Sequence, residues 1–131
     1  MNADAVLVLG VIGLVAALAS FKEYVFGGPC TADERAGCGA VYALPQARIL
    51  GVHFSVLAPL YFAALLVSLF LHAYAGIQAA FYAFAALLAA GVAMVPYLVY
   101  LEVRVARAIC MYCTVMHVVL LAMALAAYAG L

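Results

Sequence analysis

The chain has 131 residues, with five Lys and Arg balanced by five Asp and Glu, and hydrophobic residues make up 73% of it. Soluble domains are roughly 45–50% apolar, and a chain this small cannot bury so much apolar surface in a core of its own. The mean hydropathy of +1.32 therefore excludes a soluble enzyme, a nucleic-acid-binding protein and a disordered segment. We expect a single integral membrane domain that covers residues 1–131 and is surrounded by lipid.

Four apolar runs without charged residues predict four transmembrane helices. Each has about the length that a spanning helix needs, roughly 17–25 residues, and Gly76 divides the long central stretch into two. The runs show no period-2 alternation, which favours helices over the strands of a β-barrel. The predicted fold class is an all-α, integral membrane four-helix bundle, with helices at about 5–21, 52–75, 78–101 and 108–131.

The only substantial polar segment is the loop at about 22–51, between the first and second helices. Inside it, residues 45–50 predict a short interfacial helix with one apolar face. A second loop, Glu102–Arg107, is short, and its charged residues are expected either to anchor the helix boundary or to favour a nearby thiolate. With four helices, both loops lie on one side of the membrane and both termini on the other.

All four cysteines fall on the side of these two loops: Cys30 and Cys38 in the long loop, Cys110 and Cys113 at the start of the last helix. Positions i and i+3 share a helix face, so the C-x-x-C sulfurs can pair, and the helix N-terminus favours a thiolate. The pattern indicates a thiol–disulfide relay, in which the loop pair exchanges with another protein and passes electrons to the helix pair. A structural zinc site with all four cysteines as ligands is the alternative chemistry, although the wide spacing of the loop pair suits it poorly.

These pairs resemble those of the vitamin K epoxide reductase family, particularly its minimal prokaryotic members, which have a C-x7-C in the first long loop and a C-x-x-C opening the last helix. The segment from Gly51 to Tyr61 is similar to the glycine, small-residue and aromatic run that opens the family's second helix. The resemblance covers nearly the whole chain. The bacterial disulfide-generating protein DsbB has the two pairs in the reverse order and is the poorer match.

The resemblance implies a quinone-coupled thiol–disulfide oxidoreductase that generates disulfides in client proteins. Cys113 would face the quinone, of the ubiquinone or menaquinone type, and Cys110 would be its partner. Cys38 would form an interloop disulfide with Cys110, and Cys30 would exchange with a separate thioredoxin-fold protein that carries its own C-x-x-C.

Several positions depart from the family pattern, and they argue against vitamin K epoxide as the substrate. These positions are Ala43, Phe54, Ala58 and His117.

A quinone ring needs an apolar, aromatic cleft with a few polar groups. His117 follows Cys113 by one helical turn on the same face, and an ionisable side chain inside a membrane is a functional candidate. We expect it to donate a hydrogen bond to a quinone oxygen. The other candidates for quinone binding are His53, Phe54, Ser55, Tyr61 and Tyr112, with Phe62 and Tyr97 as further aromatic walls.

The basic residues predict an orientation in the membrane. All five Lys and Arg lie in the two cysteine-side loops, and the positive-inside rule places such loops in the cytoplasm and both termini outside. This is the inverse of the arrangement in familiar family members, whose cysteines face the periplasm or the ER lumen. Intracellular disulfides are common in hyperthermophiles, so an inverted orientation points to a thermophile. If the loop charges instead serve the partner protein, the family orientation holds.

The competing functional class is a non-catalytic four-helix membrane protein, such as a small transporter subunit, with a structural disulfide or zinc site. A transporter is expected to carry an essential charge within a helix. None of the four predicted helices contains one, which favours the oxidoreductase.

Overall fold

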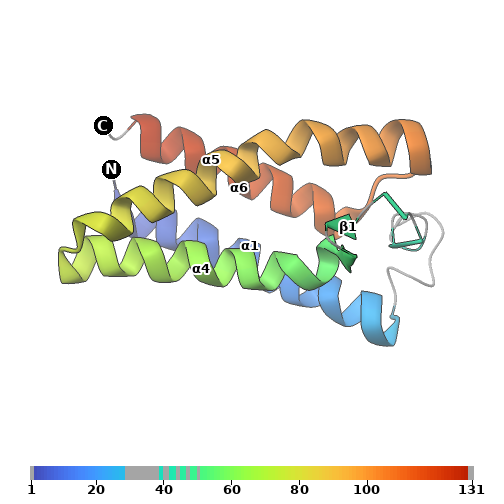
Figure 1. The fold of residues 1–131 in the computed structure, drawn as a ribbon, viewed down its shortest axis with the longest axis horizontal. Coiled ribbons are helices and arrows are strands. Elements are labelled where there is room, and N and C mark those ends of the chain that lie inside the picture. The colour runs from blue at the N-terminus through green and yellow to red at the C-terminus, as the bar shows by residue number, and fades with distance from the viewer. Residues whose placement is uncertain are drawn as a thin grey trace.

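The computed structural model describes residues 2–28, 39, 42, 43, 45, 46, 48, 49 and 51–129. Its described part contains four long helices that run lengthwise beside one another (Figure 1): α1 (Ala3–Phe26), α4 (Phe54–Ala75), α5 (Gln78–Tyr100) and α6 (Met111–Ala129). The π-helical segment η2 (Leu101–Ala106) continues α5. All four helices are long and apolar enough to cross a membrane, so the predicted all-α membrane bundle is confirmed.

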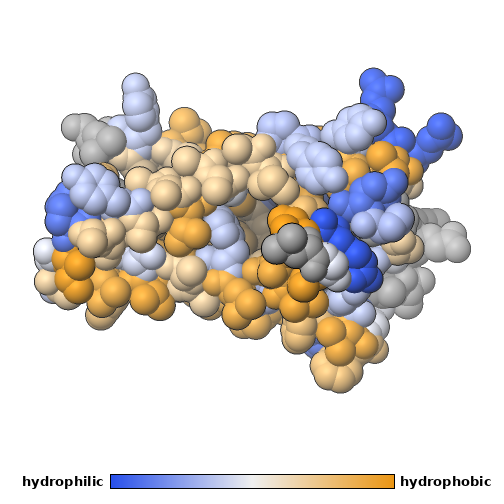
Figure 2. Space-filling model, in the orientation of Figure 1, coloured by the Kyte–Doolittle hydropathy of each residue, from blue (hydrophilic) through white to orange (hydrophobic). Residues whose placement is uncertain are grey.

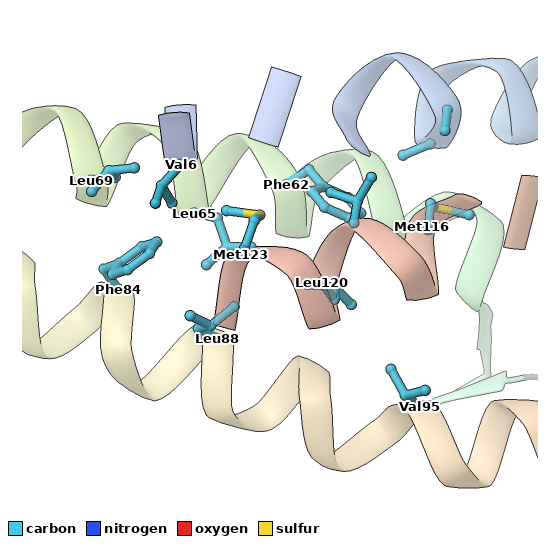
Figure 3. Close-up of a cluster of buried hydrophobic side chains, with 13 residues drawn as sticks. Val6, Phe62, Leu65, Leu69, Phe84, Leu88, Val95, Met116, Leu120 and Met123 are labelled. Carbon is cyan, nitrogen blue, oxygen red and sulfur yellow. The ribbon is translucent and has the colours of Figure 1, made fainter. Parts of the chain in front are cut away.

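The core of the bundle lies where α1 packs against α4 and α6, and where α4 packs against α5. Figure 3 shows the buried apolar side chains of these helices meeting in the interior, with Val6 of α1 among them. Gly13 lets α1 approach α4 closely, because a Cβ at this position would overlap the ring of Phe62. Large apolar residues such as Leu60 and Leu125 remain exposed on the outer faces, as expected for a surface covered by lipid.

The two ends of the bundle differ. Both chain termini lie at the same end as the α4–α5 turn, whereas a two-stranded hairpin and the start of α6 lie at the other (Figure 1). In the hairpin, β1 (Arg48–Ile49) pairs antiparallel with β2 (Val52–His53). Hydrophilic side chains gather around this end, while apolar side chains cover most of the middle (Figure 2). The described part of the long loop and the start of α6 thus share one end, as a four-helix arrangement predicts.

The helix predicted at residues 45–50 is wrong. Arg48 and Ile49 form a strand because the chain reverses at Gly51, whose φ of +82° favours glycine. The Arg48 guanidinium donates a hydrogen bond to the Gly51 carbonyl at 2.9 Å and closes this turn.

The loop predicted at Glu102–Arg107 is also wrong. No glycine or proline interrupts the chain here, so the helix continues through η2 and ends only at Arg107, which has a φ of +54°. The third span therefore extends over Gln78–Ala106 and includes the carboxylate of Glu102. The expectation that no spanning helix carries a charge is consequently wrong.

Candidate functional site

The C-x-x-C motif forms the N-terminus of α6. The Cys110 carbonyl accepts the backbone N–H of Thr114 at 3.0 Å and its hydroxyl at 2.9 Å, so Cys110 caps the helix and Cys113 lies in its first turn. Cys110 is completely buried and Cys113 is half-buried. Each side chain is a hydrogen-bonding partner of the other, as expected for two cysteines at positions i and i+3 of a helix N-terminus.

The environment of Cys110 favours its thiolate. The hydrogen bond from the Cys113 thiol is the largest effect and lowers the pKa of Cys110, and backbone N–H groups of the first turn act in the same direction. Burial and the nearby Glu102 carboxylate oppose this shift without cancelling it. Because the thiolate is both the nucleophile and the better leaving group in disulfide exchange, Cys110 is chemically the more reactive of the pair.

This environment predicts a low-pH thiolate. In the reduced protein with Cys30→Ala and Cys38→Ala, thiolate absorbance should first rise with a midpoint below the value of about 8.5 for an ordinary cysteine. Adding Cys113→Ala removes the hydrogen-bond donor and should move the midpoint of Cys110 upward. A midpoint that stays in place when Cys113 is removed would contradict the assignment of the shift to this hydrogen bond.

A cavity of about 300 Å³ lies beside Cys113, between α4, α5, η2 and α6. This volume is at the lower end of the range of about 300–1,000 Å³ that small-molecule sites occupy. Its walls are almost entirely apolar and include Leu57, Met94, Leu98, Met116 and Leu120. A cysteine of the reactive pair therefore faces a space suited to an apolar, planar ligand.

Most of the residues predicted to bind quinone meet in this cavity. Those that line it are His53, Phe54, Ser55, Tyr61, Phe62 and His117. They come from β2, which contains His53, from the first turns of α4 and from α6. The i, i+4 spacing from Cys113 predicts that His117 lies on the same face of α6.

Two predicted wall residues lie elsewhere. Tyr112 packs against Cys110 and does not line the cavity. Neighbouring helical residues point about 100° apart, so Tyr112 cannot share the direction of Cys113. Tyr97 donates a hydrogen bond to the carbonyl of Gln46 at 3.1 Å, at the hairpin end. The structure thus removes both from the cavity.

The predicted loop cysteines, Cys30 and Cys38, lie outside the described residues. The expected interloop exchange depends on them, and so does the alternative zinc site with four cysteine ligands.

Two polar side chains of the cavity differ in what they can offer a ligand. The Tyr61 hydroxyl already donates to the Leu87 carbonyl at 2.7 Å, and it lies where a Cβ on Gly91 would be, so this residue presents its ring. His117 is 8% exposed, and its ring makes no hydrogen bond within the part of the chain that the structure describes. His117 is therefore the side chain available to a ligand oxygen.

The sequence placed Glu102 in a loop, as a charge that anchors the helix boundary or favours a thiolate, and did not predict that its carboxylate lines the cavity. For Glu102 the expected effect on the thiolate is wrong, because its charge raises the pKa of Cys110. The side chain is 4% exposed, lines the cavity, and has the Cys113 thiol and the Cys110 backbone N–H as hydrogen-bonding partners. The available signal was that Glu102 is the only acidic residue after Glu34.

Tyr42 anchors the end of the long loop beside Cys110. Its hydroxyl donates to the Ser20 carbonyl at 3.2 Å and lies 2.9 Å from the Ser20 hydroxyl. Its ring meets the rings of Tyr24 and His53 edge-on, with centroids 5.7 and 5.9 Å away. Burial raises the pKa of Tyr42, so the hydroxyl stays protonated and able to donate.

The comparison with known protein families decides between the functional classes. The model of the vitamin K epoxide reductase family matches residues 5–128. The chain belongs to this family. No match was found among the curated proteins or among the solved structures. Vitamin K epoxide reductase family proteins are quinone-linked thiol–disulfide oxidoreductases that generally act with thioredoxin-like partners, and family membership together with four spanning helices makes this chain a multi-pass membrane protein.

Proposed function

We propose that this chain couples oxidation of the Cys110–Cys113 dithiol to reduction of a membrane quinone, of the ubiquinone or menaquinone type. The supporting observation is that Cys113 lines an apolar cavity while Cys110, its hydrogen-bonded partner, is covered by the anchored end of the long loop. A quinone bound in the cavity would accept two electrons and two protons. His117 would orient it through a hydrogen bond, and the aromatic rings of α4 would hold its plane.

On the other side of the dithiol, the long loop would deliver electrons from a thioredoxin-fold partner. The partner reduces a Cys30–Cys38 disulfide, and the Cys38 thiolate then attacks the sulfur of Cys110 and releases Cys113 as a thiol. Cys30 next attacks Cys38, which restores the loop disulfide and leaves Cys110 reduced.

Chain length supports this relay. Cys38 is four residues from Tyr42, so even a fully extended chain keeps the two Cα atoms within roughly 14 Å. Tyr42 itself packs beside Cys110. The low pKa of Cys110 makes it a good leaving group when Cys30 resolves the mixed disulfide.

The deciding experiment is quinone reduction by the purified protein in lipid vesicles. A reduced thioredoxin-fold protein with a C-x-x-C is added without oxygen, and quinol is followed by its absorbance. We expect one quinol for each disulfide formed in the partner, and none when the partner is supplied oxidised. No quinol, together with stoichiometric zinc and unfolding by a chelator, would instead support the structural zinc site.

We further propose that the cysteine end faces the cytoplasm. The described basic residues Lys22, Arg48, Arg104 and Arg107 belong to the ends of helices and to the hairpin on this side. The positive-inside rule favours their retention in the cytoplasm, and clients would then be intracellular proteins.

Reporter fusions should reveal this orientation. Alkaline phosphatase fused after Leu131 or inserted at Gly76 is expected to be active, and green fluorescent protein at these positions is expected to be dark. The reason is that the C-terminal end of α6 and the turn between α4 and α5 lie at the end opposite the hairpin (Figure 1). A fusion truncated after Arg107 should show the opposite pattern. Inactive alkaline phosphatase and bright green fluorescent protein after Leu131 would establish the orientation of the familiar family members.

A further inference from the structure

Glu102 is the one carboxylate among the residues that line the described cavity. It is 4% exposed, although a carboxylate is costly to bury without partners. Its side chain reaches the thiol of Cys113 and the backbone N–H of Cys110. A buried acid that touches a reacting sulfur and also faces the ligand space has the position that proton transfer needs.

The backbone holds Glu102 in this position from both directions. Its carbonyl accepts the backbone N–H of Arg107 and that of Ala108, the latter at 2.9 Å, so the segment leading to the C-x-x-C is tied to the residue. The wide π-helical turn of η2 carries the side chain inward, and such turns occur often at functional sites. Arg107 of the connecting segment is charged and exposed, which indicates that this segment meets water close to the carboxyl group.

We propose that Glu102 is a catalytic proton carrier, which takes the proton of the Cys113 thiol and passes it into the cavity. This inference rests on the proposed quinone-coupled function. Oxidation of the dithiol forms one S–S bond and releases two electrons and two protons, and reduction of a quinone to a quinol takes up the same number of each. Glu102 transfers the Cys113 proton to one quinone oxygen and is then reprotonated at the aqueous end. This second proton, which balances the one that Cys110 loses to water, reaches the other oxygen by the same carboxyl group.

His117 does not fill this role. It lies one turn deeper than Cys113 on α6. Among the described residues, no hydrogen bond joins its ring to the Cys113 sulfur or to the hairpin end, whereas Glu102 has the Cys113 thiol as a hydrogen-bonding partner. The two residues therefore divide the work: His117 orients the ligand oxygen and Glu102 moves the proton.

The test compares Glu102→Gln with Glu102→Asp, in quinone reduction driven by an apolar dithiol that needs no partner protein. Glutamine keeps the size and can still accept the Cys110 N–H, but it cannot carry a proton. We expect kcat to fall by about 10²–10⁴-fold, the usual size of a general acid–base contribution, while the KM for quinone stays the same. Aspartate keeps the carboxyl group and should restore much of kcat. Glu23→Gln is the matched control, because Glu23 is also a buried carboxylate but does not line the cavity.

A second measurement needs neither quinone nor turnover. Infrared difference spectra between the reduced protein and the protein oxidised by diamide should contain the C=O stretch of a protonated carboxylic acid, and Glu102→Gln should abolish this band while Glu23→Gln keeps it. A Glu102→Gln variant with wild-type kcat, or one that changes only KM, would overturn the proposal. So would a difference spectrum without a band assigned to Glu102. If the wild type reduces no quinone, the proposed function fails, whereas the infrared band still tests Glu102 by itself.

Discussion

Replacing Cys113 with alanine is expected to abolish quinone reduction, by about 10⁴-fold or more, as when an enzyme loses its nucleophile. Cys113 is the cysteine that lines the cavity, and without it Cys110 has no neighbouring sulfur with which to form a disulfide. Cys110→Ala should be equally inactive. The measurement is quinol formation driven by an apolar dithiol, so that no partner protein is involved.

Met111→Ala provides a matched control for this experiment. Met111 lies between the two cysteines but is half exposed on the outer face of α6. The Met111→Ala protein should therefore reduce quinone at the wild-type rate. Substantial quinone reduction by Cys113→Ala would show that electrons leave the protein by another route.

The loop cysteines should give a different result that depends on the electron donor. Cys30→Ala and Cys38→Ala are each expected to lose nearly all reduction driven by the protein partner, because the relay to Cys110 is interrupted. Reduction driven by an apolar dithiol should persist in both, because such a molecule can enter the cavity and react with Cys113 directly. Full activity toward the protein partner in all four variants, with alanine at Cys30, Cys38, Cys110 or Cys113, would contradict the relay.

The order of exchange can be read in the same set of variants. In Cys113→Ala, the Cys110 thiolate can attack Cys38 of the loop disulfide and release Cys30, and no Cys113 remains to resolve the product. Alkylation of the released Cys30 thiol should therefore trap the Cys38–Cys110 disulfide. Mass spectrometry of the unreduced, digested protein detects it as a cross-linked peptide pair. If Cys30 rather than Cys38 is linked to Cys110, the assigned roles of the two loop cysteines are reversed.

The parts of the site that repeat a helical period could be predicted from the sequence. The i, i+3 spacing of Cys110 and Cys113 and the further turn to His117 place reactive groups on one face of α6, and four apolar runs suffice to define the bundle. The same geometry, applied strictly, would have excluded Tyr112, because a residue next to Cys113 points about 100° away from it.

Other features depend on local backbone choices that the hydropathy pattern does not contain. The inward direction of Glu102 arises from a π-helical turn in a segment whose charges suggested a loop. The hairpin before α4 arises from the positive φ of Gly51, which overrides the amphipathic pattern of residues 45–50. In both cases a few backbone hydrogen bonds outweigh the average preference of the segment.

The complete burial of Cys110 beneath Tyr42 determines which cellular thiols can donate electrons to the quinone. A dithiol that exchanges electrons with quinone could also oxidise any soluble thiol that reached it, and the electrons of that thiol would pass to the quinone pool. Charged molecules such as glutathione are excluded from a sulfur with no exposed surface and from an apolar cavity, while a tethered loop cysteine competes at an effective concentration of the order of millimolar. The burial of Cys110 would thus prevent bulk thiols from reducing the quinone pool, so that only proteins that dock at the loop are oxidised by it.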